Sequence, residues 1–433
     1  MYTLQNTSSI SSLSLSLSLS LLYLCRREVE AVKKKKTFLF FGKNSKKNPM
    51  EKDSKTEEVE ETEMRSKSFA SLPPPGISMS DSSFEEMETG ITIVWGAVPV
   101  GHDKHQNVQK PQQIQVPGGI SMLALSSHYT AAINNNGTLY TWGHGMDGAL
   151  GHSGTVSETS PRAVQSLLKQ RVVKIALGDV HAAAVTDQGA LFTWGENAYG
   201  RLGLGDTKRR YGPELVRSMA VQRVTDVSLG TKHSACLTEK GHLYTWGGGS
   251  YGRLGHGSSE QEHTPRRVEF EDDLICDLDV ATKCCCAVSV SGRLYMWGRC
   301  EFQFKGRDVH IPTSVMNDGV KLARISDSHA LILLRNGDVM SYGDGSMGVL
   351  GHKKKELYGT PTVIETLKSR TVVELKAYRH ASFAILDSGD VYAWGLDKIG
   401  GFGLGKFFLL FKRLSFKYMS AHSFFRSQRN HKI

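Results

Sequence analysis

Short runs that alternate hydrophobic and polar residues recur along the middle of the chain, separated by turns that contain Gly. Three runs follow one another at 172–177, 181–185 and 191–194, with Gly189 in the turn before the last. A period of two residues predicts β-strands, and Gly suits the positive φ of a hairpin turn. Equivalent turns contain Gly137, Gly241, Gly292, Gly337 and Gly389. The pattern predicts an all-β chain of short antiparallel strands.

Tryptophan marks the length of the repeating unit, because every Trp of the chain precedes a Gly. The pairs begin at Trp95, Trp142, Trp194, Trp246, Trp297 and Trp394, and Tyr342-Gly343 fills a seventh place. Successive glycines of these pairs are 47, 52, 52, 51, 45 and 52 residues apart. A unit of about four short strands cannot bury both faces of its sheet alone, so we expect the sheets to cover one another around a ring.

Other residues keep fixed distances from these glycines. A second Gly follows eight residues later at Gly151, Gly203, Gly255, Gly306, Gly351 and Gly403, and ten residues further stands Pro161, Pro213, Pro265 or Pro361. Pro is tolerated at the edge of a sheet, so the segment around it is predicted to be an edge strand. Fourteen or fifteen residues before the glycine of the Trp-Gly or Tyr-Gly pair stands His128, His181, His233, His329 or His380, and Cys284 takes that place in one unit.

Together these motifs resemble the regulator of chromosome condensation repeat. The resemblance rests on the Trp-Gly strands, on turns such as Gly200-Arg-Leu-Gly-Leu-Gly205, on the Pro edge strand and on strands such as Gly178-Asp-Val-His181. It covers residues 91–405 and implies a seven-bladed β-propeller of four-stranded antiparallel blades. WD repeats are disfavoured, because Trp here is followed by Gly and lacks the expected neighbouring Asp.

The two ends of the repeat region depart from the pattern. The unit that contains Trp95 lacks the inner strands that the family usually supplies from the far end of the chain, and Arg413 stands where Pro is expected. Residues 406–433 are basic and rich in Phe and Leu. We expect an atypical or truncated C-terminus and an incomplete first or last blade. The alternatives are that this tail supplies the missing strands or contacts an anionic membrane.

Residues 1–90 are predicted to be a disordered low-complexity region, because Ser/Leu repeats and charged stretches bury little apolar area. An organellar transit peptide at the acid-free start and a nuclear localisation patch at 33–36 and 46–47 are alternatives. No run of 18 apolar residues is present, so no transmembrane helix is predicted. The expected compartments are the cytoplasm and the nucleus.

The charge balance says little about the repeat region. Residues 1–90 hold 13 basic and 13 acidic residues, and residues 406–433 hold 7 basic residues and no acid. The net charge of +10 therefore leaves only +3 for residues 91–405. This balance does not indicate that the propeller binds nucleic acid.

No catalytic, metal or cofactor site is predicted. The five His belong to different units, so each is expected to satisfy backbone groups within its own blade. Residues 284–286, three adjacent Cys, alternate faces of a strand and are interpreted as small buried hydrophobic residues. The Gly-rich turns do not lead into helices, as phosphate-binding loops do. We therefore predict that the chain is not an enzyme and binds no cofactor.

Basic clusters are the candidate partner-binding residues, because the loops after the Trp-Gly strands should emerge on one side of the ring. The clusters contain Lys208, Arg209, Arg210, Arg266, Arg267, Lys353, Lys354 and Lys355. The resemblance implies an interaction platform that binds a protein partner through such loops. Solvated charges at the edge of the ring are the simpler interpretation of the clusters.

Two other functions stay open at this point. Guanine-nucleotide exchange on a small GTPase is the first, although intervals of 45–52 residues leave no room for the inserted hairpin of the family's exchange factors. Binding to chromatin or another acidic surface is the second. Light sensing, which the family can perform with additional Trp, is rejected because all six Trp belong to Trp-Gly pairs.

Overall fold

The computed structural model describes residues 114–396 with their side chains, apart from residues 272 and 379 and the side chain of residue 305. It also describes the backbone of strands at 38–39, 92–96, 108–113 and 412–414. Contacts divide the chain into two units, one formed by Met1–Lys43 with Gly90–Ile433 and the other by Asn44–Thr89. All described residues belong to the first unit.

Six four-stranded antiparallel sheets make up most of the described residues. The first two sheets consist of β4 Met122–Leu125, β5 Tyr129–Ile133, β6 Leu139–Gly143 and β7 Glu158–Ala163, and of β8 Val172–Leu177, β9 His181–Thr186, β10 Leu191–Gly195 and β11 Arg210–Leu215. The third and fourth consist of β12 Val224–Leu229, β13 His233–Thr238, β14 Leu243–Gly247 and β15 Glu262–Arg267, and of β16 Ile275–Val280, β17 Cys284–Ser289, β18 Leu294–Gly298 and β19 Val309–Met316. The fifth and sixth consist of β20 Val320–Ile325, β21 His329–Leu334, β22 Val339–Asp344 and β23 Leu357–Val363, and of β24 Val372–Tyr378, β25 Ala381–Leu386, β26 Val391–Gly395 and β27 Lys412–Leu414. A further sheet contains β1 Phe38–Leu39, β2 Thr92–Gly96 and β3 Val108–Ile114.

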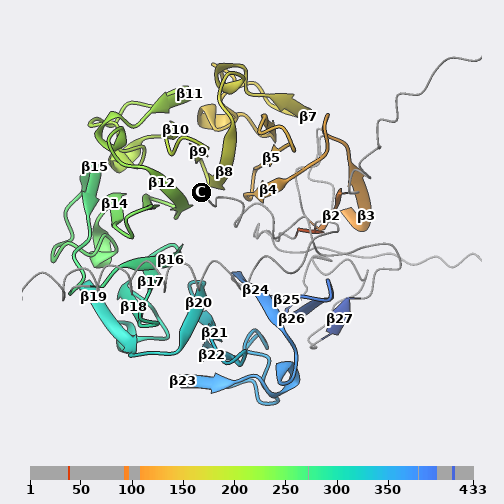
Figure 1. Ribbon diagram of the computed structural model, residues 1–433, viewed down its shortest axis with the longest axis vertical. Coiled ribbons are helices and arrows are strands. Elements are labelled where there is room, and N and C mark those ends of the chain that lie inside the picture. The colour runs from red at the N-terminus through yellow and green to blue at the C-terminus, as the bar shows by residue number, and fades with distance from the viewer. Residues whose placement is uncertain are drawn as a thin grey trace, which may run out of the picture. The chain divides into compact units, whose positions relative to one another are not determined.

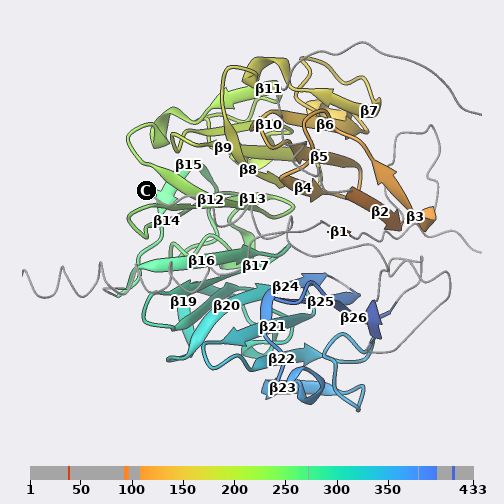
Figure 2. The same ribbon diagram turned by 45° about the vertical axis from the view of Figure 1, so that its right-hand side comes forward.

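The sheets follow one another around an axis, as the blades of a propeller do (Figure 1). In each four-stranded sheet the first strand lies nearest the axis and the last lies at the rim (Figure 1). The view in Figure 2 shows the same succession of sheets from a different angle. Neighbouring sheets contact one another mainly through these inner strands, for example β8 with β12 and β16 with β20.

Seven short 3₁₀ turns are found among the described residues. They are η1 Met146–Gly148, η2 Gln165–Leu167, η3 Ala198–Gly200, η4 Arg217–Met219, η5 Ser250–Gly252, η6 Phe304–Gly306 and η7 Glu365–Leu367. No helical segment in the described part of the chain is long and apolar enough to cross a membrane.

The predicted propeller of four-stranded blades is confirmed, with six complete blades where the resemblance implied seven. The sheet that contains Trp95 has three strands, and its short strand β1 lies parallel to β2. The incomplete first blade was expected. The tail at 406–433 supplies β27, which pairs with β26 and places Arg413 opposite Tyr392. The tail therefore supplies the outer strand of the last blade, whereas the alternative placed it in the blade that contains Trp95.

Packing between blades forms the core. One cluster joins Leu237 and Leu243 of β13 and β14 to Leu278, Tyr295 and Trp297 of the following blade. All six four-stranded sheets have a Trp-Gly or Tyr-Gly strand as the third strand, and the turn glycines predicted from sequence have positive φ, such as 79° at Gly189. Strand β8 coincides with the predicted run at 172–177. Local patterning therefore specified the blades, and burial between them stabilises the ring.

Candidate protein-interaction surfaces

Tryptophan side chains join four of the complete blades to the blade before them. The indole Nε1 of Trp194, Trp246, Trp297 and Trp394 donates to a backbone carbonyl of the preceding blade at 2.7–2.9 Å. Trp142 is also buried, and the side chain of Trp95 lies outside the described residues. Because these indoles are buried and their N–H groups are already hydrogen-bonded, they stabilise the packing between blades and are not exposed to a ligand.

Three of the predicted His also bridge blades. The Nε2 atom of His181 lies 3.2 Å from Ser234 Oγ, that of His233 lies 3.2 Å from Cys285 Sγ, and that of His329 lies 2.8 Å from Ser382 Oγ. Each partner belongs to the following blade, so the prediction of contacts within one blade is wrong for these three. The bridge forms because β9, β13 and β21 are covered on both sides by neighbouring sheets.

His128 and His380 do not occupy the same structural position as the other three. The residues opposite the glycine of the Trp-Gly pair are Tyr129 and Ala381, whereas His181 faces Gly195 directly. A shift of one residue turns a side chain to the other face of a strand. His128 and His380 are half-buried, with Nδ1 atoms at 2.8 Å from Ser127 Oγ and 2.9 Å from Met347 Sδ. A spacing of 15 residues, against 14 elsewhere, was the signal in the sequence.

The buried His and Cys are not reactive groups. Burial, reinforced by the positive charge of Arg201, lowers the pKa of His181 to about 3, and burial also lowers that of His329 to about 3. The thiols of residues 284–286 are buried, as predicted, and burial raises the pKa of Cys285 well above its ordinary value. Neutral imidazoles and protonated thiols at these positions fit a structural role.

Charged side chains also link the inner strands. Asp277 on β16 accepts from Arg324 on β20 at 2.7 Å, and Arg324 lies 3.5 Å from Glu374 on β24. Burial raises the pKa of Asp277, while Arg324 opposes that shift. Burial by itself would lower the pKa of Arg324, but Asp277 and Glu374 raise it above its ordinary value, so the guanidinium stays charged. A second pair joins Lys174 to Asp226 at 3.2 Å.

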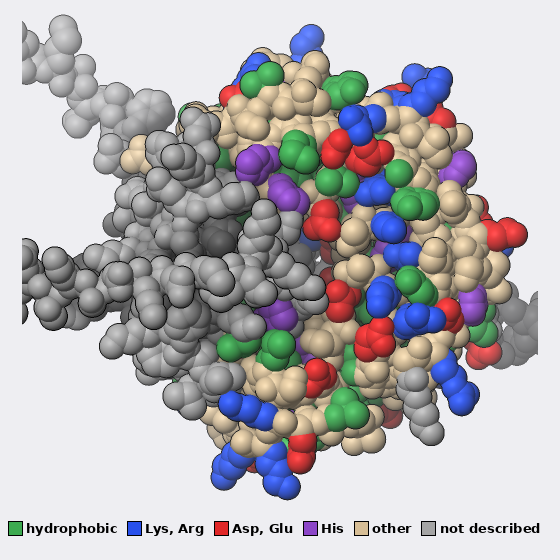
Figure 3. Space-filling view, turned by 180° about the vertical axis from the view of Figure 1, so that it is seen from behind, with side chains coloured by type: hydrophobic (Ala, Val, Ile, Leu, Met, Phe, Trp, Pro, Cys, Tyr) green, Lys and Arg blue, Asp and Glu red, His purple; other side chains and the backbone are tan. Residues whose placement is uncertain are grey.

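The predicted basic clusters lie on three different blades. Lys208, Arg209 and Arg210 precede or begin β11, Lys353, Lys354 and Lys355 precede β23, and Arg266 and Arg267 end β15. Carboxylates partner five of the eight: Arg209 with Asp147 and Glu196, Arg210 with Asp206 and Glu214, Arg266 with Glu262, Arg267 with Glu269, and Lys354 with Glu356. On the face shown in Figure 3, basic, acidic and hydrophobic side chains are intermixed. The clusters do not converge into one basic site.

The structure brings together a different set of residues, which sequence reasoning did not select. In each four-stranded sheet the first and third strands run in the same direction, so the loops that follow them emerge on the same side. In the second to fourth complete blades the third strands are followed by loops at 196–209, 248–261 and 299–308, and the first strands by loops at 178–180, 230–232 and 281–283. We call this side the loop face. Tyr199 lies 5.0 Å from Lys232 Nζ, and Tyr251 lies 5.6 Å from Lys283 Nζ and 4.4 Å from the Arg299 guanidinium carbon, each measured to the ring centroid.

These five residues, Tyr199, Lys232, Tyr251, Lys283 and Arg299, form what we call the tyrosine row. Its cations come largely from the next blade along the ring, at distances typical of cation–π contacts. The signal in the sequence was the motif Tyr-Gly-Arg-Leu-Gly, which occurs at 199–203 and again at 251–255, together with Thr-Lys at 231–232 and 282–283. The row places aromatic and basic groups side by side on the loop face.

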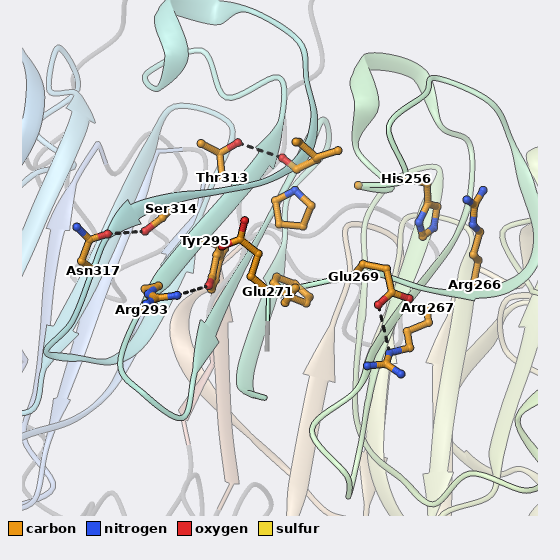
Figure 4. Close-up of a pocket in the computed structure, with 14 residues that line it drawn as sticks. His256, Arg266, Arg267, Glu269, Glu271, Arg293, Tyr295, Thr313, Ser314 and Asn317 are labelled. Atoms are coloured by element: carbon orange, nitrogen blue, oxygen red, sulfur yellow. Dashed lines mark hydrogen bonds and ion pairs between the residues drawn. The ribbon is translucent and has the colours of Figure 1, made fainter. Parts of the chain in front are cut away.

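A groove lies at the rim between the outer strands of two blades. It has a volume of about 770 Å³ and lies between β15 and β19 (Figure 4). Arg266 and Arg267 line it on one side, and Arg293, Tyr295 and Ile311 line it on the other. The groove therefore contains one of the three predicted basic clusters.

Known proteins share this architecture. Human HERC2, an E3 ubiquitin-protein ligase, is 29% identical over 301 residues, which cover 66% of this chain and 6% of HERC2. The chain thus matches only a small part of that relative's length. The ultraviolet-B receptor UVR8 of Arabidopsis thaliana is 28% identical over 318 residues, covering 71% of this chain and 72% of UVR8.

Solved structures show the same fold. Human WBSCR16 superposes with a TM-score of 0.64 at 22% identity, covering 72% of this chain and 85% of that structure. Prp20p of Saccharomyces cerevisiae superposes with a TM-score of 0.64 at 21% identity, covering 75% and 85%. Residues 91–414 match the RCC1-like domain, so the match extends over β2, β3 and the six complete blades. The chain therefore belongs to the RCC1-like domain family.

Proposed function

We propose that this chain is a protein-interaction platform whose loop face binds a partner protein. The observation that carries the proposal is the tyrosine row, in which equivalent loops of adjacent blades present Tyr199 and Tyr251 among basic side chains. Tyr and Arg are enriched among the residues that dominate the binding energy of protein interfaces. Tyr199 keeps 38% of its surface exposed, so it is available to a partner.

Hydrogen bonds hold the loops that carry the two tyrosines in the free protein. Tyr199 and Tyr251 have φ angles of 67° and 70°, and this left-handed conformation costs a non-Gly residue about 1–2 kcal/mol. Arg201 donates to the carbonyls of Ala198 and Thr231, and so ties its own loop to a loop of the next blade at 3.0 and 2.9 Å. Arg253 makes the equivalent pair of bonds. A rigid aromatic anchor loses little conformational entropy on binding.

Binding, rather than catalysis, is the activity that these features support. No group of three or more His, Cys, Asp and Glu that could hold a metal is found in the described part of the chain. Prp20p was characterised for its binding to Gsp1p and histones. We extend only the general property, binding of a protein partner, to this chain. The ligase activity of HERC2 is not carried over, because the match covers 6% of that protein.

Nucleotide exchange on a small GTPase is the second candidate, and fold likeness to Prp20p, which binds Gsp1p, favours it. Chromatin binding is a weaker candidate, because carboxylates pair with most of the basic clusters and leave no extended basic patch among the described residues. The compartment, cytoplasm or nucleus, stays a prediction.

A pull-down from cells that express the natural protein tests the proposal. We expect the wild-type chain to retain a partner that the double variant Tyr199→Ala/Tyr251→Ala loses, because the variant removes both anchors. Tyr211→Ala is the matched control, since Tyr211 is an equally exposed tyrosine on the rim strand β11. Equal retention by the wild type and the double variant would refute the assignment of the loop face.

A nucleotide-release assay separates the two candidates. Small GTPases loaded with a fluorescent guanine nucleotide are mixed with the purified chain. Accelerated release that the double variant abolishes would establish exchange as the activity. Retained pull-down without accelerated release supports an interaction platform alone.

A further inference from the structure

The rim groove between β15 and β19 lies beside a connection between blades that lacks the short turn found in three others, as does the connection at 317–319. In three other connections the turns η2, η4 and η7 place Leu167, Met219 and Leu367 in buried positions under the outer strand. The described residues of the connection at 268–274 contain no such turn. Phe270 occupies this connection instead, with its ring edge-on to Tyr295 at 5.1 Å and to Trp297 at 6.0 Å. An aromatic floor therefore lies at the base of the groove.

Arg267 occupies a position that varies between blades. It pairs with Tyr244 across the strands, and the equivalent residue is Ala163, Leu215 or Val363 in three other blades, Ser314 in the blade across the groove and Arg413 in the last blade. Its Nε lies 3.9 Å from Glu269, too far for a hydrogen bond, and its side chain is 46% exposed. Arg266 differs, because it is engaged by Glu262 at 2.6 Å. Arg267 therefore presents a guanidinium that makes no hydrogen bond with the described residues.

Ile311, on the opposite wall, is a departure from the repeat. The residue before the edge-strand Pro is Ser160, Gly212, Thr264 or Thr360 in the other blades, and only this blade among the five has a large apolar residue there. Ile311 is 59% exposed and lines the same groove as Arg267. Neither side chain contributes to the core, so core packing does not explain them.

Arg293 completes the groove on the Ile311 side. Its Nη1 contacts Asp273 Oδ2 and Tyr295 Oη, both at 3.2 Å, and Tyr295 Oη donates to the same carboxylate at 2.7 Å. These contacts fix the guanidinium while its Nε and Nη2 remain available for a carboxylate. Two arginines thus line the groove together with the apolar side chains of Phe270 and Ile311.

We propose that this groove binds a short extended segment of a partner protein in which an apolar residue stands beside acidic residues. Carboxylates of the segment would pair with Arg267 and Arg293, and the apolar side chain would cover Ile311 and Phe270. Glu269 and Glu271 also line the groove, so only carboxylates placed directly against the two arginines are favoured, and the continuous negative charge of a nucleic acid is not. The inference rests on the proposed function, and it assigns a second surface that is separate from the loop face.

Fluorescence anisotropy with synthetic peptides tests this inference on the full chain. The probe is a labelled seven-residue peptide with Leu at its centre and Asp on both sides, flanked by Gly and Ser. The two comparison peptides replace both Asp by Asn or the Leu by Ser. We expect binding of the first peptide and at least about tenfold weaker binding of the other two, because each loses charged hydrogen bonds or apolar contact.

Two variants copy residues of other blades and so preserve the fold. Arg267→Leu copies Leu215 of β11, and Ile311→Thr copies Thr264 of β15. Each should weaken the Asp-Leu-Asp peptide about tenfold with an unchanged melting temperature. The control Arg162→Ala removes a rim arginine of another blade, which pairs with Glu158, and should leave affinity unchanged. No binding by the wild type, or equal binding by both groove variants, overturns the inference.

The double variant Tyr199→Ala/Tyr251→Ala separates this inference from the proposed function. Peptide binding should persist in that variant, because the tyrosine row lies on the loop face. Loss of the pulled-down partner with intact peptide binding supports both surfaces. An absent peptide signal with an intact pull-down removes the groove and leaves the loop face standing.

Discussion

Trp246 donates its indole N–H to the backbone carbonyl of Arg201, 2.9 Å away in the preceding blade. The hydroxyl of Ser234 donates to the same oxygen at 2.7 Å. Two hydrogen-bond donors of this blade therefore share one backbone carbonyl of the preceding blade. The same arrangement recurs at Arg253, with Cys285 and Trp297, and at Val349, with Ser382 and Trp394.

The shared carbonyl predicts a non-additive pair of substitutions. Ser234→Ala and Trp246→Phe should each destabilise the fold, Trp246→Phe by about 2 kcal/mol from lost packing and one lost hydrogen bond. Either change alone leaves the Arg201 carbonyl with one donor. The double variant leaves it buried without a donor, so we expect a further loss of about 1 kcal/mol beyond the sum. Urea unfolding of the four proteins measures this coupling, and strict additivity would contradict it.

Positive φ favours glycine at positions 203 and 205, and at position 203 the neighbouring indole also leaves no room for a Cβ. Both have positive φ, 73° and 86°. A Cβ on Gly203 would lie 2.8 Å from Trp246 Nε1, whereas a Cβ on Gly205 would meet only Thr264 Cγ2 at 3.8 Å. Gly205→Ala should cost about 1–2 kcal/mol from backbone strain, and Gly203→Ala about 1–3 kcal/mol more from the clash. Thermal unfolding compares the two variants, and equal losses would show that the indole contact is unimportant.

The buried histidines predict a loss of stability in mild acid. Burial holds the pKa of His181 and His329 at about 3 in the folded chain, below the ordinary value of 6.5. The unfolded chain therefore binds more protons, and stability present above pH 6.5 is lost as the pH falls from 6.5 towards 3. Each His contributes a slope of up to about 1.4 kcal/mol per pH unit in that window.

Substitution isolates this contribution. His329→Gln should unfold with a shallower pH dependence between pH 6.5 and 5 than the wild type, because one proton-binding group is removed. The raised pKa values of Asp277 and Asp279 act with the opposite sign, but they are common to both proteins and cancel in the comparison. Parallel stability curves would rule out the buried imidazole as the source.

The inner-strand ion pairs predict a large cost for removing one partner. Arg324→Met leaves the carboxylates of Asp277 and Glu374 without the guanidinium that now lies 2.7 and 3.5 Å away. We expect a loss of about 3–5 kcal/mol, since the buried carboxylate of Asp277 loses its ion-pair partner, whereas Glu374 keeps Lys376 at 3.3 Å. Lys354→Met is the control, because its side chain is 76% exposed and should change stability by at most about 0.5 kcal/mol. Similar losses in the two variants, measured by denaturant unfolding, would contradict a buried network.

Much of the architecture could be read from local patterns. The alternating strands, the turn glycines and the Trp-Gly spacing each act within one unit, and the strand predicted at 172–177 coincides with β8. The second repeated glycine was recognised by its spacing, but its reason was not, because the indole that covers Gly203 belongs to Trp246 of the next blade. The sequence of one unit can show that a residue recurs, but it does not show which residue of the next unit that residue contacts.

The candidate sites show the same division. Lys208, Arg209 and Arg210 look like one basic cluster in the sequence, yet Asp147 of the preceding blade partners Arg209 and Glu214 partners Arg210. Tyr199 and Lys232 are 33 residues apart and belong to different blades, so only the ring brings the ring centroid and the ammonium within 5.0 Å. Arg267 was selected for its charge, whereas its availability depends on the connection beside it.

The sequence by itself determined that this protein is a ring of repeated four-stranded sheets, because strand alternation, turn glycines and buried Trp are short-range requirements that each unit states for itself. The tertiary structure alone decided which side chains the buried histidines meet in the next blade, which basic residues are neutralised, and where the tyrosine row and the rim groove lie. All of these features depend on the contacts between neighbouring blades. A one-residue change of register or one altered connection changes those contacts without disturbing the repeat.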